Sequence, residues 1–357
     1  MTGRLDDAAR CDWIALARAP KVGPVTFFQL IAKFGDPGRA IKAMPGLSAD
    51  RDSAATELDE SRALGADIIC AGEDIYPELL NELSPPPPVI SIKGNAELFE
   101  RPTIALVGAR DASAAGRKLA RMIARDLGAG GLVTASGMAR GIDGEVHAAS
   151  LETGTIAVLA GGVDQIYPPQ HAELYHEICA QGLIVSERAL GHRATARDFP
   201  RRNRIITGLA IGTVVIEAAE RSGSLISARM AGEQGREVMA VPGSPLDARA
   251  AGTNRLLRNG ATLVRDAADI IEAVSTQIDR ADVFVQQTLP LDGTPVETQD
   301  DDQMVARILE ALSPTPMPIA EIARASGCSA RECAARLMEL ELDGVALTHA
   351  GGLASRA

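Results

Sequence analysis

The sequence predicts an α/β protein: a doubly wound, Rossmann-like parallel sheet, with a helical domain before it and a winged-helix domain after it. From residue 103 onward, short segments that are apolar throughout alternate with helical patterns, which is typical of a parallel sheet covered on both faces. Of its residues, 46% are hydrophobic and 23% charged, which is the composition of a soluble globular protein. A chain of 357 residues is too long for one core. An acidic stretch separates a helical tail from the rest.

Residues 1–66 are predicted to form the N-terminal helical domain. The segment 12–43 has the pattern of helices with a tight break at Gly23-Pro24. The break resembles the hairpin of helix-hairpin-helix modules, in which amides at a helix N-terminus hold a DNA phosphate. A plain helix-to-helix connector is the alternative. The proline run in LSPPPPVISIKGN, residues 83–95, predicts a rigid, extended crossing into the central domain.

Residues 67–279 are predicted to form the Rossmann-like core, with its binding crevice beyond the carboxyl ends of the strands. The expected strands are 103–108, 132–136, 155–162, 183–187, 212–218 and 237–243. The expected helices are 113–128, 141–154, 172–182, 203–210, 225–235 and 253–261. This alternation is that of repeated strand–helix units.

Residues 280–303 have the composition of an acidic, poorly structured linker, and residues 304–357 that of a winged helix-turn-helix. In the tail, three helical stretches precede a small hairpin, and they lie near 304–312, 318–326 and 329–342. The third carries two arginines against three glutamates: Arg331 and Arg336, with Glu332, Glu339 and Glu341. A recognition helix in the major groove should be net positive. We therefore expect the tail to contact protein or to regulate, and not to read duplex DNA.

The charge of the chain is unevenly distributed. The whole chain has a formal net charge of -11, yet residues 101–265 carry 20 Lys and Arg against 15 Asp and Glu. Residues 1–100 carry 10 against 16, and residues 266–300 carry 1 against 8. A basic middle between acidic neighbours favours a local site for a polyanion. A randomly mixed surface is the alternative.

Glycine-rich and arginine-rich turns fall where the expected strands hand over to helices. Glycine lets a backbone approach a ligand closely, and a helix N-terminus offers free amides with a positive dipole end. The pattern predicts a phosphate-binding rim. Its candidate residues are Gly108, Arg110 and Ser113 after the first core strand, Ser136, Gly137, Arg140, Gly141 and Asp143 after the second, and Ser222, Gly223 and Ser224.

The decapeptide FPRRNRIITG, residues 199–208, is predicted to be a helix that adds to this rim. Ile205, Ile206 and Leu209 form its apolar face, and Arg202 lies three positions before Ile205. Arg201 and Arg204, three positions apart, share another face. We expect Arg201 and Arg204 to reach outward to phosphates and Arg202 to be held in an internal ion pair. The alternative is that all three are structural and tie the helix to Glu187 or Glu217.

Several other functions are disfavoured. There is no GxGxxG dinucleotide fingerprint after residue 103 and no GxxxxGK[ST] loop, so we expect no cofactor. Asp143 and His147 near Ser136 suggest a hydrolase triad, but no GxSxG elbow accompanies them. Five cysteines without a CxxC pair favour a reducing cytoplasm, and no apolar run is long enough to span a membrane.

The ordered motifs resemble the DprA family of DNA-processing proteins, also called Smf. They are VGARDAS, SGMARGIDGEVH, GGVDQIYP, SERALGHRATARDFPRRNRIITGL, EAAERSGSLISARMAGEQGREVMAVPGS and GTNRLL, and they span roughly residues 70–265. The resemblance implies a SAM-like N-terminal domain, sequence-independent binding of single-stranded DNA and a homodimer formed through the core. It also implies loading of the recombinase RecA onto incoming strands during natural transformation, with no established catalytic activity.

By motif, the resemblance implies a DNA pocket lined by Arg110, Ser136, Gly137, Arg140, Gly141, Asp143, Arg201, Asn203 and Arg204. The competing function is a nucleotide-processing enzyme of the phosphoribohydrolase-like Rossmann class. Those enzymes use a PGGxGTxxE signature, which this chain lacks. The segment IGTVVIEA matches it only in part.

Overall fold

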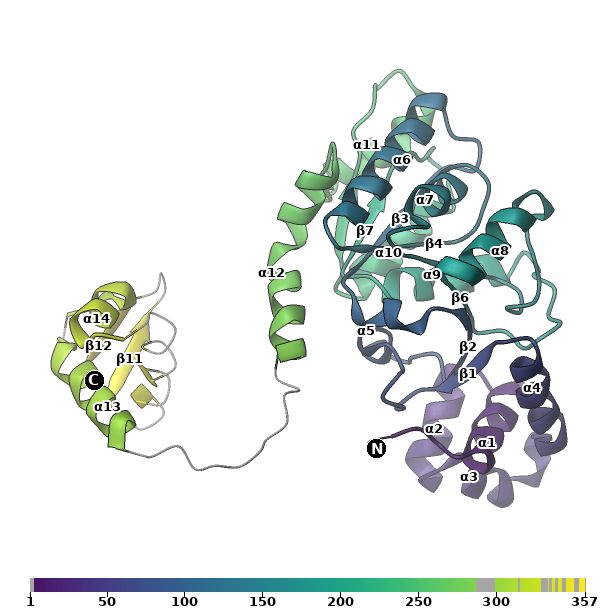
Figure 1. Ribbon diagram of the computed structural model, residues 1–357, viewed down its shortest axis with the longest axis horizontal. Coiled ribbons are helices and arrows are strands. Elements are labelled where there is room, and N and C mark those ends of the chain that lie inside the picture. Colours follow the sequence, from purple (N-terminus) through teal and green to yellow (C-terminus); the bar gives the residue numbers. More distant parts are fainter. Residues whose placement is uncertain are drawn as a thin grey trace. The chain divides into compact units, whose positions relative to one another are not determined.

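The computed structural model describes residues 3–286, 299–313 and 315–328, and beyond these 333, 336, 337, 340, 341, 345–349 and 353–356. The chain divides into two compact units, Met1–Gln287 and Thr288–Ala357 (Figure 1). The first contains the N-terminal helices and a nine-stranded sheet, and the second contains a three-stranded sheet with helices.

The N-terminal helices begin where the sequence supplies caps. They are α1 (Asp7–Arg18), α2 (Pro24–Phe34), α3 (Pro37–Ala43) and α4 (Arg51–Ala63). The carboxylates of Asp6, Asp36 and Asp50 each accept a hydrogen bond from an amide of the following first turn, which satisfies donors that a helix leaves free there. The expected break at Gly23-Pro24 is confirmed, because Gly23 caps α2 and Pro24 opens it.

Nine strands form the main sheet, in the order β1-β2-β6-β5-β4-β3-β7-β8-β9. Strands β3 to β9 run parallel, and the order reverses around β3, as in doubly wound folds. The predicted fold class is confirmed. The strands are β1 (Asp67–Cys70), β2 (Val89–Gly94), β3 (Thr103–Val107), β4 (Val133–Ser136), β5 (Thr155–Val158), β6 (Leu183–Ser186), β7 (Gly212–Val215), β8 (Glu237–Ala240) and β9 (Thr262–Leu263).

Helices cover both faces of this sheet. On one face, Ile104 and Leu106 of β3 pack with helices α6, α7 and α12, and on the other Ala105 and Val107 pack with α9 and α5. Successive residues of one strand thus serve two cores, so the strand is apolar throughout. The helices are α5 (Glu78–Asn81), α6 (Ala114–Ala129), α7 (Ile142–Ser150), α8 (Ala172–Gln181), α9 (Asp198–Gly208), α10 (Ser224–Glu233), α11 (Ala251–Arg258) and α12 (Ala267–Gln286).

The extended crossing expected after the proline run is part of the sheet. Residues 89–94 form β2, which pairs antiparallel with both β1 and β6. The prolines end at residue 88, so every amide of β2 is free to join a ladder. The strands β1 and β2 extend the sheet toward the N-terminal helices, and Ile68 and Val89 are buried with Ile14 and Leu58.

The tail shows the expected winged-helix elements and corrects the expected linker. Helix α12 continues to Gln286 and α13 (Gln299–Ala311) begins before the end of the predicted 280–303 linker, while 287–298 lie outside the described residues. Helix α14 (Ile319–Ser326) follows, and β10 (Met317–Pro318), β12 (Leu353–Arg356) and β11 (Ala346–His349) form the small sheet. The predicted third helix, 329–342, is described at only five positions.

Candidate nucleic-acid interface

The turns after β3, β4 and β5 leave the sheet at the same edge. Ala105 lies opposite Ala135, and Ser136 lies opposite Ala157, so the three strands end in register. Gly141 has φ +78°, and a Cβ there would lie 2.3 Å from the carbonyl oxygen of Ala109. Only glycine allows the turn after β4 to press against the turn after β3 in this way. The chain segments that carry Arg110 and Arg140 are therefore neighbours.

Arg202 lies beneath this edge and is structural. Its guanidinium is buried, and Nη1 donates to the carbonyl oxygens of Gly137, at 2.5 Å, and Val158. Burial lowers the pKa of Arg202 to about 10, against the opposing charge of Asp143. Arg202 is internal as expected, but the predicted ion pair is wrong: its hydrogen-bond partners are the carbonyl ends of β4 and β5. A side chain on Gly137 would collide with this guanidinium.

Ser136 and Asp143 were expected to line the pocket, and the structure places them inside the protein. Ser136 is fully buried, and its hydroxyl donates to the Leu106 carbonyl at 2.7 Å. Asp143 is 7% exposed and accepts from the amides of Gly137 and Ala139, each at 3.2 Å. Burial raises the pKa of Asp143 despite nearby Arg202. The two side chains shape the turn after β4 and do not face a ligand.

A small hollow of about 20 Å³ lies at this edge, lined in part by Gly137, Gly161 and Arg202. Its rim carries an aromatic pair, Tyr167 and Phe199, whose ring centroids are 5.5 Å apart. The Arg110 guanidinium lies over the Phe199 ring at 5.2 Å from its centroid, a cation–π contact. Both aromatics stand inside motifs that carry the family resemblance, but only the fold shows that they form a pair.

Three of the four expected arginines are exposed at this edge without a carboxylate partner. Arg110, Arg140 and Arg201 are exposed, and none forms an ion pair with a residue that the structure describes. The planar guanidinium group of an unpaired arginine can donate two parallel hydrogen bonds to the oxygens of a phosphate. We call Arg110, Arg140 and Arg201, with Tyr167 and Phe199, the strand-end rim.

Arg204 departs from the expectation that it reaches outward beside Arg201. Its guanidinium pairs with the Glu187 carboxylate, and both side chains are 20% exposed. The Glu187 carbonyl also accepts a hydrogen bond from Arg18 of α1, at 2.9 Å. The alternative interpretation held that all three arginines are structural, and Arg204 is the one that contacts Glu187. Asn203 is half-buried between Arg202 and Arg204 on α9.

The turn before α10 lies after β7, which adjoins β3 in the sheet. Gly223 is exposed and caps α10, and the hydroxyls of Ser222 and Ser224 lie 2.7 Å apart. The N-terminus of α6 is capped by a carboxylate, because Glu217 accepts from the amide of its N-cap residue Ser113, at 3.0 Å, and from the Ser113 hydroxyl. The first amides of α10 are partnered too: those of Ser224 and Leu225 donate to the Ser222 hydroxyl, at 3.4 Å, and carbonyl, at 3.2 Å, and that of Ile226 donates to the Gly223 carbonyl at 3.0 Å.

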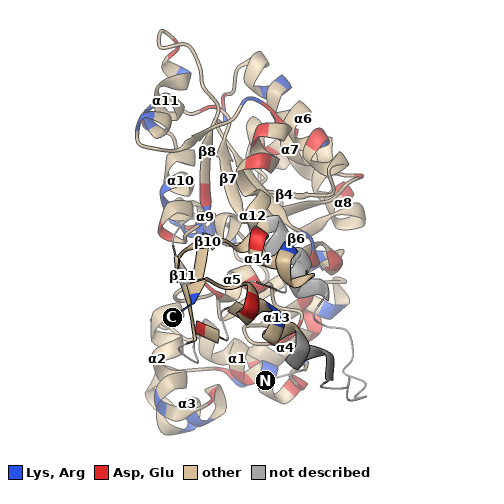
Figure 2. Cartoon of the chain, turned by 90° about the vertical axis from the view of Figure 1, so that its left-hand side faces the viewer, with Lys and Arg blue, Asp and Glu red and all other residues tan. Residues whose placement is uncertain are grey.

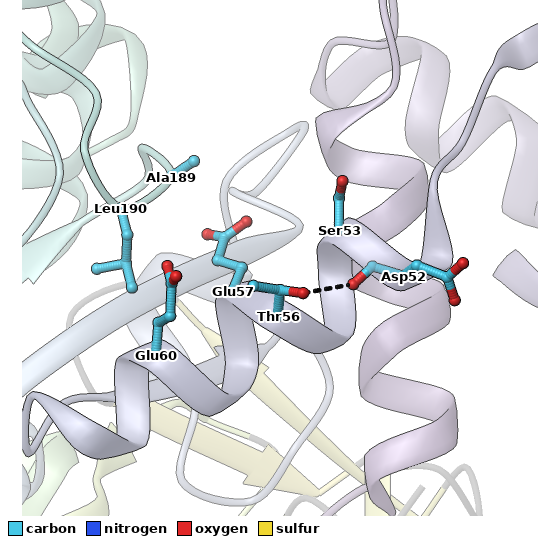
Figure 3. Close-up of a pocket in the computed structure, with 7 residues that line it drawn as sticks. All are labelled: Asp52, Ser53, Thr56, Glu57, Glu60, Ala189 and Leu190. Atoms are coloured by element: carbon cyan, nitrogen blue, oxygen red, sulfur yellow. Dashed lines mark hydrogen bonds between the residues drawn. The ribbon is translucent and has the colours of Figure 1, made fainter.

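Two hollows larger than the one at the strand ends are lined by carboxylates and lie beside α4. Figure 3 shows one of them, of about 340 Å³, where Glu57 and Glu60 of α4 point toward Leu190. The Thr56 hydroxyl at its edge donates to the Asp52 carbonyl at 2.9 Å. An adjoining hollow of about 360 Å³ shares Glu57 and also contains Asp50. Carboxylates repel phosphate, so size alone would misplace the site.

The hydrolase triad considered from sequence is not assembled. His147 is fully buried, its Nδ1 lies 2.7 Å from the Thr155 hydroxyl, and Asp143 is held by backbone amides. Burial lowers the pKa of His147 to about 3. Within the described ranges, no group of three or more His, Cys, Asp or Glu could hold a metal ion. In those same ranges, no helix is both long and apolar enough to cross a bilayer.

The fold and the strand-end rim define a class: a Rossmann-like protein with exposed arginines at the strand ends that have no carboxylate partner among the described residues. The chain matches three family models in order along its length. These are the DprA-like N-terminal HHH domain over residues 7–65, DNA recombination-mediator protein A over 67–275 and the DprA winged helix domain over 293–352. The chain belongs to the DNA recombination-mediator protein A family, DprA/Smf, as the sequence motifs indicated.

Relatives and solved structures agree with this assignment. The chain is 30% identical to Protein Smf of Synechocystis sp., over 93% of this chain and 95% of that protein. It is 41% identical to DNA processing protein DprA of Streptococcus pneumoniae, over 56% and 71%. The crystal structure of the Streptococcus pneumoniae protein matches with a TM-score of 0.61 and 32% identity, over 74% of this chain and 92% of that chain. A structure concerning the single-stranded DNA binding mode of DNA processing protein A from Helicobacter pylori matches with a TM-score of 0.53 and 27% identity, over 57% and 94%.

Proposed function

We propose that this protein binds single-stranded DNA without sequence preference and delivers it to the recombinase RecA during DNA uptake. The observation that carries the proposal is a set of three exposed arginines without carboxylate partners among the described residues: Arg110, Arg140 and Arg201. Arg110 covers Phe199, which lines the hollow, and Arg140 and Arg201 are the chain neighbours of Ala139 and Arg202, which also line it. Backbone phosphates are the anion that such a set of guanidinium groups fits. The Helicobacter pylori relative, described for its single-stranded DNA binding mode, supports the same ligand.

The aromatic pair supports a single strand over a duplex. Tyr167 is 52% exposed and lies next to Phe199, which Arg110 covers. A base can stack on such a surface only when it is free of its pairing partner. Because stacking is tolerant of base identity, we expect weak sequence preference.

Arg204, Asn203, Asp143 and Ser136 keep a supporting role in this proposal. They hold the turn after β4 and the helix α9 in place, and Arg110, Arg140 and Arg201 make the phosphate contacts. Gly137 and Gly141 leave room for the close packing of the turns. The homodimer is proposed through the core, where β9 is the last strand of the sheet and its Leu263 is 50% exposed. Light scattering of the wild type and of Leu263→Lys tests that surface.

The decisive experiment is a fluorescence-polarisation titration of the full chain with a labelled oligonucleotide at two ionic strengths. We expect tight binding at low salt, a steep loss at high salt, and weak competition by duplex DNA or by free nucleotides. Release of free base from AMP, or competition by AMP as strong as that by the oligonucleotide, would favour the phosphoribohydrolase-like alternative. Recombinase loading is measured separately, as the rate of RecA filament formation on strands coated with single-strand binding protein.

A further inference from the structure

The loop between β6 and α9, residues 187–197, is organised around one buried carboxylate. Asp198, at the start of α9, has a side chain only 5% exposed. Its Oδ2 accepts from the Thr195 amide at 2.8 Å and the Thr195 hydroxyl at 2.7 Å, and lies 3.0 Å from His192 Nε2. Its Oδ1 accepts from the Arg188 guanidinium. Four groups of one loop thus converge on a single side chain.

Burial alone would raise the pKa of Asp198, but the hydrogen bonds from His192 and Thr195 and the charge of Arg188 hold it well below its ordinary value. The carboxylate is therefore ionised and fully partnered at neutral pH. A buried carboxylate with this many donors is available to fix a loop and is not available to a ligand.

The same loop is attached to the strand-end edge. The Gly162 amide donates to the His192 carbonyl at 2.9 Å, which ties the loop to the turn after β5. Ala194 lines the hollow at the strand ends together with Phe199 and Arg202. Arg193 is the residue next to Ala194, and consecutive Cα atoms lie about 3.8 Å apart. The loop thus borders the strand-end rim.

Two cations of this loop have no assigned role. Arg193 and Arg197 are exposed, and neither forms a hydrogen bond or ion pair with a residue that the structure describes. With Arg201 of the rim they recur every four residues. Arg188, the remaining arginine of the loop, is instead bound to Asp198. The loop therefore separates one structural arginine from two that are free.

We propose that residues 187–197 form a second phosphate-binding arm of the interface, with Arg193 and Arg197 as its contact side chains and Asp198 as the residue that positions them. The proposal rests on the proposed binding of single-stranded DNA and adds a surface to it. Asp198 does not touch the strand. Its role is to hold Arg188, His192 and Thr195, so that the arm keeps one shape and the two free guanidinium groups stay beside the hollow.

The positioning role of Asp198 predicts a change in affinity opposite to the one that charge alone predicts. Removing a negative charge near a polyanion site strengthens binding if the charge acts only through its field. Removing the Asp198 charge weakens binding if the carboxylate orders the arm. The matched control is Asp111→Asn, because Asp111 is exposed on the turn after β3 and has no partner in the described parts of the chain.

The test is a polarisation titration of the full chain with a labelled oligothymidylate at several salt concentrations. Four variants are compared with the wild type: Asp198→Asn, the pair Arg193→Ala/Arg197→Ala, the combination of all three changes, and Asp111→Asn. We expect Asp198→Asn and the arginine pair each to weaken binding about tenfold and to lower the salt slope by about 1.4, the value for two lost phosphate contacts on a single strand. The combination should bind like the arginine pair alone, and Asp111→Asn should bind as well as the wild type or better.

Three outcomes overturn the inference while leaving the proposed function standing: unchanged or tighter binding by Asp198→Asn, wild-type affinity in the arginine pair, or a further tenfold loss when the changes are combined. Absence of oligonucleotide binding by the wild type overturns the proposed function and this inference with it. Thermal unfolding of each variant checks that the fold is intact. The arginine pair is exposed, so it tests the arm even if Asp198→Asn unfolds.

Discussion

Arginine is used in opposite ways in the N-terminal helices and at the strand-end rim. Every arginine in residues 1–66 pairs with a carboxylate, and basic and acidic positions lie side by side among α1, α3 and α4 (Figure 2). At the rim, Arg110, Arg140 and Arg201 have no such partner within the described ranges. The first arrangement neutralises charge within the fold, and the second leaves charge for a ligand. Partnering, more than the number of arginines, marks the candidate site.

The largest effect on stability is expected in the N-terminal region. Arg10 and Glu73 form a pair with both side chains 1% exposed. Arg10→Met leaves the Glu73 carboxylate buried without its cation, so we expect the free energy of unfolding to fall by about 3–5 kcal/mol. Denaturant unfolding measures it. The folded fraction should bind oligonucleotide with wild-type affinity; a large loss of affinity in folded protein would contradict the division between the two regions.

The largest effect on binding is expected at the rim. Arg140→Glu replaces an unpaired cation with an anion beside a polyanion, so we expect affinity for single-stranded DNA to fall about 100-fold with unchanged thermal stability. Arg39→Glu is the matched control, because it makes the same charge change at an exposed N-terminal arginine that pairs with Asp36. Equal losses in the two variants would show that overall charge, and not the rim, governs binding.

Acid should lower the free energy of unfolding through groups other than the arginines of either region, because guanidinium groups keep their charge at low pH. Burial lowers the pKa of His147 to about 3, so the folded state stays neutral while the unfolded chain takes up a proton below pH 6.5. The contribution of neutral His147 to the free energy of unfolding is therefore fully present above about pH 6.5. It falls by about 1.4 kcal/mol per pH unit from there down to the folded-state pKa of about 3.

Urea unfolding at pH 7 and pH 5 measures this slope in the wild type, in His147→Gln and in His176→Gln. His176 is exposed on α8, which makes it the control. The contribution should disappear only in His147→Gln. An equal acid slope in all three proteins would assign the loss to other groups.

The smallest effect is expected at the exposed N-terminal pairs. The Arg39 and Asp36 side chains are 75% and 49% exposed, so their attraction is screened by water and salt. Arg39→Met should change the free energy of unfolding by less than about 1 kcal/mol, and urea unfolding measures it. A loss as large as that of Arg10→Met would show that exposure does not distinguish the pairs of this region.

The sequence predicted the core well because its signals are local. Apolar runs, glycine turns and caps fixed the parallel strands and their helices, and the buried role of Arg202 followed from its spacing to Ile205. The antiparallel β1 and β2 were missed, because a strand that joins the far side of β6 depends on pairing across the sheet. The partners of Arg204 and Asp143 were also missed, because a buried carboxylate and an exposed one look alike in sequence.

The aromatic part of the rim was hidden for a similar reason. Phe199 and Tyr167 are 32 positions apart in the chain, and each stands beside a proline that suggests a backbone role. Only the fold brings their rings together and places Arg110 over that of Phe199. Arg193 and Arg197 carried a readable signal, the four-residue spacing to Arg201, although that spacing runs through a loop and not along one helix.

Glu187 joins two parts of the first unit through one residue. Its side chain holds Arg204 of α9, and its carbonyl holds Arg18 of α1. A tilt of the N-terminal helices would therefore be transmitted to the arginine-bearing helix without any change in the sheet. A variant without α1 would lose the hydrogen bond from Arg18, so one of the two contacts that hold Glu187 between the N-terminal helices and α9 would be gone.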